Sequence, residues 1–391
     1  MTRPTALARA ASIADLRARA RRRLPRFAFD FIDGGAGAED GVTRNREDLR
    51  AVALVPRYLV DVSNIDTRVT LFGRTYNVPF LMAPVGFLNM AWPGADLAMA
   101  RLCAERGMVH VVSTASSTPV GEIAEAAGGN AWFQLYPAAD AAINEHLMAS
   151  AERAGIEVLV LTVDVPVPAK RNRDTRNALA VPFKPSVRLA LDLAMHPAWS
   201  LATLRHAPLR MANMDGLQPG GGKLSLADIQ KRMVGAATDW TTLAAVRKRW
   251  RGPLLVKGIM APDDALRCVK AGADGIIVSN HGGRQVEASL SSAAALPGVV
   301  DAVGGQVPVL LDSGVRGGED AVRAKALGAS AVLAGRAFAY GAGAGGAAGM
   351  ARAFDVLDFG LRSTLAHIGR PCFADVAGDV LAGAQGNRVP S

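Results

Sequence analysis

The sequence predicts a single (β/α)8 TIM barrel, preceded by an N-terminal helical segment and interrupted by a long insertion after the fourth strand. Eight short apolar runs, each followed by small or polar residues, are typical of buried strands in a parallel sheet. Six of the seven spacings between their ends are 22 to 33 residues, which fits one crossover helix with its loops. The seventh spacing is 94 residues and contains the insertion. An open doubly wound sheet is the alternative, but it does not ordinarily reach eight parallel strands.

Each predicted element can be placed along the chain. Helix-like stretches between the strands cover residues 95–106, 141–154, 262–271 and 318–327, and two of them end in a glycine, as helix C-termini often do. Residues 1–391 are therefore interpreted as one domain, with residues 182–233 as its insertion. The predicted strands are residues 79–84, 109–113, 132–135, 157–162, 254–257, 275–279, 307–312 and 331–335.

The composition excludes several classes of protein. Half of the residues are hydrophobic and 20% are charged, which is typical of a globular enzyme and not of a disordered chain. The three cysteines are far apart and form no C-x-x-C pair, which excludes a disulfide framework, a zinc ribbon and covalently attached haem. They fit a reducing compartment, so we expect a cytoplasmic protein without a metal site. Neither a transmembrane run nor a signal peptide is recognisable.

The positive charge is concentrated at the N-terminus. Residues 1–26 contain eight arginines and one aspartate, which is +7 of the net charge of +9. This distribution argues against a nucleic-acid-binding face. Two interpretations of residues 17–23 stay open: a solvated face of the N-terminal helix, or attraction to anionic lipid.

The insertion has an unusual composition. Residues 183–214 contain four lysines or arginines, one aspartate and no glutamate, among many leucines, methionines and alanines. The segment could be a surface loop or a partner-binding arm. It could equally be an interfacial anchor that is apolar on one side and basic on the other.

The carboxyl ends of the strands carry the candidate functional residues, as in other barrels of this type. Every predicted strand ends in glycine, polar or charged residues, which chance does not easily produce. These residues are Pro84, Val85 and Gly86; Ser113 and Thr114; Gln134 and Tyr136; Thr162, Asp164 and then Arg171; Lys257; residues 279–284; residues 312–316; and Gly335 with Arg336.

The last two strand ends indicate a phosphate site. Gly314 and Gly335 allow backbone N–H groups to approach an anion, and Arg316 and Arg336 supply positive charge. Phosphate sites after the seventh and eighth strands are common in these barrels.

His281 is the best candidate for a general base. It lies in a glycine-flanked loop at a strand end, and imidazole titrates near neutral pH. Asp164 could stabilise its charged form. Arg171 and Arg284 provide two guanidinium groups suited to one carboxylate. This pattern favours an anionic substrate whose α-position loses a proton or a hydride.

Six ordered motifs resemble the family of FMN-dependent α-hydroxy acid dehydrogenases and oxidases. The most specific is Ser279-Asn280-His281-Gly282-Gly283-Arg284-Gln285, and the similarity extends over residues 13–369. The other five are Phe29-Asp30-Phe31 with the glycines that follow, Trp132-Phe133-Gln134-Leu135-Tyr136, Leu161-Thr162-Val163-Asp164, Leu255-Val256-Lys257-Gly258 and Leu311-Asp312-Ser313-Gly314-Val315-Arg316.

The resemblance implies an FMN site. Lys257 would lie near the N1–C2=O edge of the flavin and favour its anionic reduced form. The residues implied to hold the flavin ring are Ala83, Pro84, Val85, Ser113, Gln134, Thr162 and Ser279. Those implied to hold the ribityl phosphate are Asp312, Ser313, Gly314, Arg316, Gly335 and Arg336.

The resemblance also implies the catalytic roles. His281 would take the substrate hydroxyl proton or α-proton, and Asp164 would stabilise the imidazolium. Arg171, Arg284 and Tyr136 would orient the substrate carboxylate. The family often forms tetramers, so we expect a homo-oligomer.

Some positions depart from the family pattern. Phe31 stands in the substrate site where many members have a tyrosine, and losing that hydrogen bond would cost about 0.5–1.5 kcal/mol of binding free energy. Glu287 replaces a usual aspartate. Gly86 replaces the alanine of glycolate-oxidase-like members, and Ala115 replaces a tryptophan of some members, which leaves room for a bulky substrate.

The insertion is similar to that of two subgroups. Residues 191–213 resemble the insertion of bacterial (S)-mandelate dehydrogenases and respiratory L-lactate dehydrogenases, in which this segment attaches the enzyme to the membrane and electrons pass to quinone. The resemblance therefore implies peripheral contact with the inner face of the cell membrane.

The sequence thus predicts oxidation of an (S)-2-hydroxy acid, mandelate-like or L-lactate, to the 2-oxo acid, with quinone or another acceptor. An oxidase that reduces O₂ to H₂O₂ is one alternative. An FMN barrel that isomerises or reduces another substrate is a second alternative. A binding protein without turnover is disfavoured by the set of catalytic residues.

Overall fold

The computed structural model describes residues 7–178, 186–206, 208–215, 217 and 238–383. Eight parallel strands close into a barrel in the order β10-β3-β4-β5-β6-β7-β8-β9. The predicted barrel is confirmed, and the open doubly wound sheet is excluded. The strands are β3 (Phe80–Met82), β4 (Val109–Ser113), β5 (Ala131–Leu135), β6 (Leu159–Thr162), β7 (Leu254–Ile259), β8 (Gly275–Val278), β9 (Val309–Asp312) and β10 (Ala331–Ala334).

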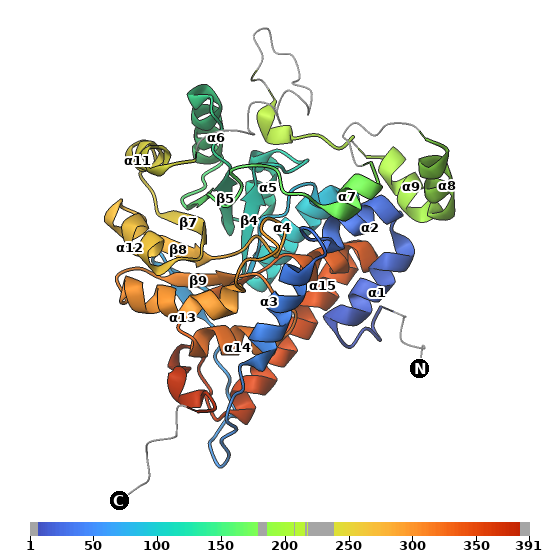
Figure 1. The fold of residues 1–391 in the computed structure, drawn as a ribbon. Helices are drawn as coiled ribbons and strands as arrows, with labels where there is room; N and C mark the ends of the chain where they lie inside the picture. Colours follow the sequence, from blue (N-terminus) through green and yellow to red (C-terminus); the bar gives the residue numbers. More distant parts are fainter. Residues whose placement is uncertain (1–6, 179–185, 207, 216, 218–237, 384–391) are drawn as a thin grey trace, which may run out of the picture.

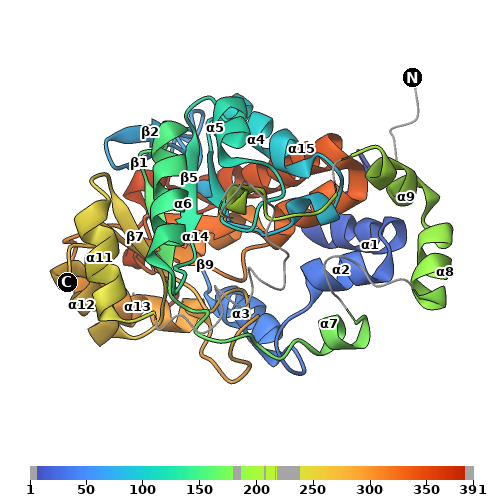
Figure 2. The same ribbon diagram turned by 90° about the horizontal axis from the view of Figure 1, so that it is seen from above.

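Helices surround the barrel (Figures 1 and 2). The four predicted helices are present, with ends within one residue of the expected positions: α4 (Ala95–Arg106), α6 (Ala141–Arg153), α12 (Pro262–Lys270) and α14 (Gly318–Ala326). The others around the barrel are α5 (Val120–Ala126), α11 (Trp240–Arg249), α13 (Ser292–Val303) and α15 (Arg336–His367), and α15 bends where Gly345 and Gly346 leave helical geometry.

The N-terminal helical segment consists of α1 (Ile13–Arg23), α2 (Arg26–Asp33) and α3 (Asp40–Ala51). Ser12 begins α1 with a capping box, in which its hydroxyl accepts from the Asp15 N–H and the Asp15 carboxylate accepts from the Ser12 N–H. Figure 2 shows α1 and α2 next to α15. These helices bring the start of the chain onto the barrel.

An antiparallel hairpin that the sequence did not reveal follows, formed by β1 (Val69–Leu71) and β2 (Arg74–Tyr76). Phe72 and Tyr76 pack edge to face on Trp132, with ring centroids 5.6 and 6.4 Å apart. Trp132 lies at the start of β5, so the hairpin closes the amino end of the barrel. Access to the barrel interior is therefore left at the carboxyl ends of the strands.

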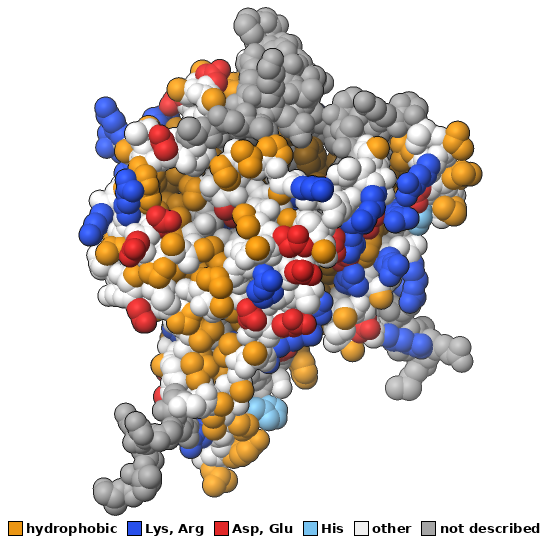
Figure 3. All heavy atoms as spheres, in the orientation of Figure 1, with side chains coloured by type: hydrophobic (Ala, Val, Ile, Leu, Met, Phe, Trp, Pro, Cys, Tyr) orange, Lys and Arg blue, Asp and Glu red, His pale blue; other side chains and the backbone are white. Residues whose placement is uncertain are grey.

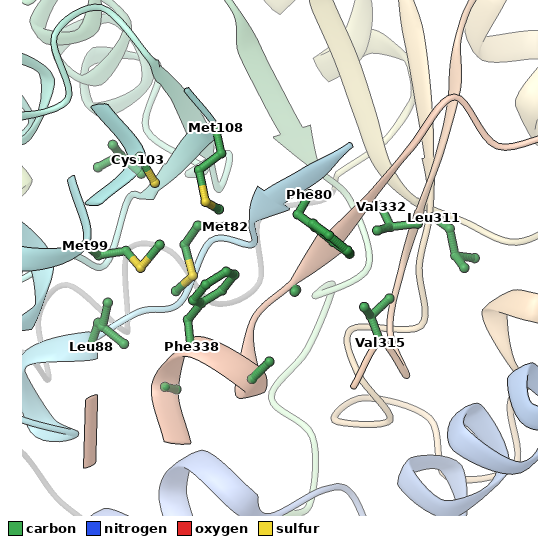
Figure 4. Close-up of a cluster of buried hydrophobic side chains, with 14 of the residues drawn as sticks. Phe80, Met82, Leu88, Met99, Cys103, Met108, Leu311, Val315, Val332 and Phe338 are labelled. Atoms are coloured by element: carbon green, nitrogen blue, oxygen red, sulfur yellow. The ribbon is translucent and has the colours of Figure 1, made fainter. Parts of the chain in front are cut away.

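The larger hydrophobic core lies between the strands and the surrounding helices. Figure 4 shows Phe338 of α15 against Met82 of β3, with Met99 and Cys103 of α4 on the same side. These side chains are at most 1% exposed. Burying one such large apolar side chain stabilises the fold by about 1.5–3 kcal/mol.

The predicted insertion carries short helices that project from one side of the molecule (Figures 1 and 2). They are α8 (Val187–Met195) and α9 (Pro197–Leu204). The 3-10 turn η2 (Ala212–Met214) follows them and is buried, and α7 (Asn172–Arg176) comes before the insertion. The rest of the predicted insertion, residues 182–185, 207, 216 and 218–233, lies outside the described residues. No described helix is both long and apolar enough to cross a membrane.

Trp199 attaches α9 to the body of the protein. Its side chain is 2% exposed, its Nε1 donates to the carbonyl of Met90 at 3.0 Å, and its ring meets Phe27 edge to face at 5.6 Å. The opposite side of the two helices is apolar and exposed. Its members are Val187, Leu191, Met195, Leu201 and Leu204, which we call the outer apolar face.

Candidate active site

A pocket of about 320 Å³ lies at the carboxyl ends of the strands. It brings together most of the residues that the sequence analysis selected. Those lining it are Phe31, Ala83, Pro84, Val85, Ser113, Tyr136, Arg171, Lys257, His281, Arg284, Asp312, Ser313, Gly314, Arg316, Gly335 and Arg336. The remaining four, Gln134, Thr162, Asp164 and Ser279, lie behind this lining and are hydrogen-bonded to it or paired with it in the sheet.

His281 lines this pocket and is in direct contact with Asp164 behind it. The imidazole Nδ1 lies 2.8 Å from Asp164 Oδ1, and Nε2 lies 3.3 Å from the Tyr136 hydroxyl. Because the carboxylate fixes the proton on Nδ1, Nε2 is left as the proton acceptor. His281 has a φ of 59°, a left-handed conformation that costs a non-glycine residue about 1–3 kcal/mol and is characteristic of functional sites.

The electrostatic environment keeps His281 neutral and Asp164 ionised. Burial lowers the pKa of His281, and Asp164 offsets this only in part, so the pKa lies below its usual value. Burial acts in the opposite sense on Asp164, but His281 and Lys257 outweigh it and lower the pKa of this carboxyl. At neutral pH the pair is therefore a free imidazole beside a carboxylate, which is the state that a general base requires.

Lys257 is held by a buried network. Its ammonium lies 2.8 Å from the Ser279 hydroxyl, 3.0 Å from Asp312 and 4.0 Å from Asp164. Burial lowers the pKa of Lys257, but the two carboxylates more than offset it and raise the pKa above its usual value. The lysine is thus a fixed cation. The Asp312 carboxylate is paired with this ammonium. Contact with a phosphate is therefore left to the neighbouring residues that were predicted together with Asp312.

Gly258, next to Lys257, sets the direction of this cation. The register between β7 and β8 shifts between Lys257 and Ile259, and Gly258 has a φ of 104°. A β-carbon at this position would lie 2.5 Å from that of Asp164. Only glycine therefore permits the bulge that brings Lys257 and Asp164 together.

The two predicted carboxylate-binding arginines meet at the mouth of the pocket. Arg171 Nε donates to the Arg284 carbonyl at 3.4 Å, while Arg284 Nη1 donates to the carbonyls of Phe31 and Gly34. Burial lowers the pKa of Arg284 well below its usual value, and the neighbouring Arg171 and Arg336 lower it further. This crowding of positive charge favours an anion between them.

The opposite end of the pocket has the features of a phosphate site. Gly335 is the N-cap of α15 without a side-chain cap, so the first N–H groups of this long helix face the pocket near Gly335. Gly314 has a φ of 92°, and a β-carbon there would lie 2.5 Å from the Asn45 carbonyl. Arg316 lines the same end. Arg336 instead directs its guanidinium to the carbonyls of Ile32, Gly34 and Gly282 and so fixes the surrounding backbone.

Two buried polar groups behind the pocket fit an FMN cofactor. Gln134 Nε2 and Thr162 Oγ1 are buried, and neither has a hydrogen-bond partner among the described residues. Such groups normally find a partner, so a bound group with ring carbonyls and nitrogens accounts for them. The pocket therefore offers a fixed cation, unpartnered donors and a phosphate cradle in one cavity. These residues fit FMN.

We predict that Gln134→Leu weakens FMN binding without harming the protein that lacks it. Leucine removes the unpartnered Nε2 amide group but also the 3.3 Å bonds that Ser113 Oγ and Thr114 N donate to Gln134 Oε1, so the free energy of unfolding of the apoprotein should change by no more than about 1 kcal/mol. The FMN dissociation constant, measured by fluorescence titration, should rise about tenfold for one lost hydrogen bond. Gln306→Leu is the matched control, because that amide is bonded to the Val303 carbonyl far from the pocket. Equal FMN affinity in the two variants would contradict the assignment.

The structure explains two departures from the family pattern. Phe31 meets Phe87 edge to face with ring centroids 6.4 Å apart and lies 5.3 Å below the Arg284 guanidinium, so it closes the pocket with an apolar wall. The Glu287 carboxylate accepts the N–H of Ala38 and occupies the space where a side chain at Gly37 would point. The longer glutamate thus fastens the chain after α2.

Several supporting residues were not identified from the sequence. Asn45 of α3 and Asn280 exchange two hydrogen bonds of 2.8 Å through their amides, and Gly283 N donates to Asn280 Oδ1 at 3.0 Å. Gln285 Nε2 donates to the Asp164 carbonyl at 3.0 Å. These contacts fix the His281 loop. Asn280 and Gln285 belong to the most specific motif, but nothing in the local pattern around Asn45 pointed to this partnership.

The comparisons with known proteins agree with this geometry. The family model described as FMN-dependent dehydrogenase matches residues 20–382. An L-lactate dehydrogenase of Caulobacter vibrioides is 42% identical over 385 residues, which are 97% of this chain and 98% of the relative. A crystal structure of the monotopic membrane protein (S)-mandelate dehydrogenase superposes with a TM-score of 0.89 at 38% identity, covering 95% of this chain and 98% of the other. A mandelate oxidase with (S)-2-phenylpropionate has a TM-score of 0.80 at 36% identity, covering 94% and 96%.

Proposed function

This chain belongs to the FMN-dependent dehydrogenase family, and from that premise we propose that it oxidises an (S)-2-hydroxy acid, mandelate-like or L-lactate, to the 2-oxo acid. The observation that carries the proposal is the 2.8 Å contact between His281 and Asp164. It lies in the same pocket as Arg171, Arg284 and Tyr136, which suit a carboxylate.

The proposed base is His281. Conversion of the alcohol to the ketone removes two protons and two electrons from the hydroxyl group and its carbon, and FMN, when bound, accepts the electrons. Nε2 of His281 takes a proton, either from the hydroxyl or from the α-carbon, and both routes need this base. Asp164, at 2.8 Å from Nδ1, stabilises the imidazolium that forms.

The proposed carboxylate site is formed by Arg171, Arg284 and Tyr136. Burial, with the nearby Asp164, raises the pKa of Tyr136 to about 12, so its hydroxyl remains a hydrogen-bond donor at neutral pH. The guanidinium groups supply charge and orientation. Phe31 contributes no hydrogen bond, so binding rests on the other three residues.

The pocket supports a bulky substrate. Gly86 and Ala115 both line it, and a β-carbon at Gly86 would already lie 3.0 Å from that of Ala115. Small side chains at both positions leave space for the substituent of the hydroxy acid. We therefore propose that mandelate-like acids are preferred over glycolate.

The proposed reaction predicts that (S)-mandelate or L-lactate bleaches the flavin absorbance when mixed anaerobically with the holoenzyme. Rapid bleaching measures the reductive half-reaction without any electron acceptor. Rates with the two acids and with glycolate rank the substrates. Bleaching by glycolate and none by mandelate would overturn the size preference, and no bleaching by any of them would overturn the reaction class.

We propose that the electrons leave to a quinone in the membrane. The 42% identity to an L-lactate dehydrogenase, against 36% to the mandelate oxidase, supports a dehydrogenase over an O₂-reducing oxidase. The yield of H₂O₂ in air distinguishes the two. The homo-oligomer expected from the resemblance, a tetramer, stays a prediction that light scattering would test.

We also propose that the outer apolar face contacts the cytoplasmic face of the cell membrane. Its five apolar side chains are 54–82% exposed. Figure 3 shows Lys and Arg side chains gathered over α1 and α2, beside the helices α8 and α9 that carry the outer apolar face. Exposed Arg21, Arg22 and Arg26 lie in that region, and each basic residue near an anionic surface contributes about 1 kcal/mol. The apolar face and the charge together support the anchor interpretation of the insertion.

We predict that Leu191→Glu with Leu204→Glu abolishes binding to vesicles that contain anionic lipid. Each leucine withdrawn from lipid forfeits about 1.5–3 kcal/mol, so the partition coefficient should fall at least a hundredfold. Leu59→Glu is the control, since that leucine is fully exposed next to the carboxyl end of α15, where Arg57 N donates to the His367 carbonyl. Flotation with vesicles measures the binding. Retained flotation of the double variant would contradict the proposal.

A further inference from the structure

A second cavity, of about 330 Å³, lies between α9, α4 and the loop after β4. Trp199 and Leu97 supply apolar walls, while Arg101, Glu122, His206 and Arg210 form its polar side. The proposed hydroxy-acid chemistry does not use it. It therefore requires its own explanation.

Two hydroxyl groups at this cavity lack partners. Ser117 follows β4 and Thr203 belongs to α9, and both residues line the cavity. The oxygen of each hydroxyl is buried and has no hydrogen-bond partner among the described residues. Buried hydroxyls without partners are rare in proteins, and a ligand with two acceptor oxygens would satisfy both.

Only a thin wall separates this cavity from the flavin pocket. Ala115 lines the flavin pocket, and Ser117, two residues further along the chain, lines the second cavity. Phe87 and Asn89 are divided between the two cavities in the same way. Two residues span at most about 7 Å. A ligand in the second cavity would thus be close to any cofactor in the first.

Hydrogen bonds make this wall rigid. Ser116 Oγ donates to the buried Asp96 carboxylate at 2.9 Å, and Thr118 N donates to Ser116 Oγ at 3.1 Å. Asn89 Nδ2 donates to Thr118 Oγ1 at 3.2 Å, which joins the two segments of the wall, residues 87–89 and 115–118. The separation of the two cavities is therefore fixed by the fold.

The cavity adjoins the outer apolar face. Thr203 lies in α9 between Leu201 and Leu204, whose side chains are 54% and 82% exposed. A ligand with an aromatic ring, two carbonyl oxygens and an apolar tail matches the walls of Trp199 and Leu97, the two hydroxyls and the exposed leucines beside Thr203.

We propose that the second cavity is the quinone site, with Ser117 and Thr203 as donors to the two carbonyl oxygens, and this inference rests on the proposed hydroxy-acid dehydrogenase function. In the step, the quinone takes two electrons from the reduced cofactor and two protons from solvent to give the hydroquinone. The hydroxy acid supplies the electrons. Ser116 and Asp96 act as positioning residues for the wall.

The test compares two half-reactions in the holoenzyme. Ser117→Ala with Thr203→Val removes both donors, and Leu97→Trp fills the cavity by a different route. Both variants should raise KM for a short-chain ubiquinone, about ten- to a hundredfold for the loss of two hydrogen bonds. Anaerobic bleaching by the hydroxy acid and turnover with a soluble redox dye should stay constant. Thr75→Val with Ser150→Ala, hydroxyls on the hairpin and on α6, is the matched control.

The outcomes separate this site from the proposed function. An unchanged KM for quinone in both variants, with normal bleaching, would overturn the site. Absence of bleaching in the unmodified enzyme would overturn the hydroxy-acid reaction instead. Direct binding of the quinone to the oxidised holoenzyme, followed by quenching of tryptophan fluorescence, then tests the site without turnover. Equal affinity of the unmodified and Leu97→Trp proteins in that measurement would also overturn it.

Discussion

Replacing His281 with asparagine is expected to lower kcat for hydroxy-acid oxidation by about 10²–10⁴, the usual contribution of a positioned general base. Asparagine cannot accept the proton that Nε2 takes, although it can still donate toward Asp164, 2.8 Å from Nδ1 in the intact site. The FMN content should be unchanged, since the phosphate and ring contacts lie elsewhere in the pocket. The rate of anaerobic flavin bleaching measures this step directly.

The pH profile provides an independent check on the same residue. Because burial lowers the pKa of His281 below its usual 6.5, the imidazole is already unprotonated at neutral pH. The value of kcat/KM should therefore be level near pH 7 and fall only as the pH decreases through the lowered pKa. The residual activity of the asparagine variant should lack this acid limb. If the asparagine variant still showed the fall in kcat/KM at acidic pH, or if its kcat decreased less than tenfold, the general base would be another group.

Replacing Lys257 with methionine is expected to have the second largest effect. The change leaves the Asp312 carboxylate, 3.0 Å from the ammonium in the intact protein, buried without its cation. Breaking a buried ion pair on one side costs about 3–5 kcal/mol of folding free energy. Oxidation of the hydroxy acid should also be lost, because the change removes the buried cation that the proposed FMN site places beside the flavin.

The control for this prediction is the double variant Lys257→Met with Asp312→Asn. Neutralising both partners removes the unpaired charge, so the double variant should recover much of the stability but none of the activity. Denaturant unfolding monitors the first quantity, and flavin bleaching the second. Equal stability of the single and double variants would show that Asp312 does not depend on Lys257.

The barrel could be predicted from the sequence because its signal is local. Each strand is a short buried apolar run, and in β4 the expected residues 109–113 agree with the strand observed. The hairpin of β1 and β2 was not found, since strands of three residues are too short to show alternation. α13 was not identified either, and it contains Pro297, which ordinarily argues against a helix interior.

The candidate residues at the strand ends could be selected from the sequence, but their hydrogen-bond partners could not. The motifs around His281, Lys257 and Asp164 selected strand ends that the closed barrel brings together. His281 and Lys257 line the pocket, and Asp164 contacts His281 from behind it. That Arg336 donates to three backbone carbonyls could not be foreseen, because those carbonyls belong to segments 54 and about 300 residues away in the chain. The cavity beside Ser117 depends in the same way on α9 docking through Trp199.

The hydrogen bonds between the N-terminal segment and the loop after β8 have a consequence for the order of folding. The carbonyls of Phe31 and Gly34 receive Arg284, and the amide of Asn45 pairs with that of Asn280, across 235 to 253 positions of chain. Loops of this length close late, after the local helices and neighbouring strands have formed. We therefore expect catalytic activity only after the N-terminal segment has packed against the loop that follows β8. A chain arrested before that step would possess most of its barrel and still be inert.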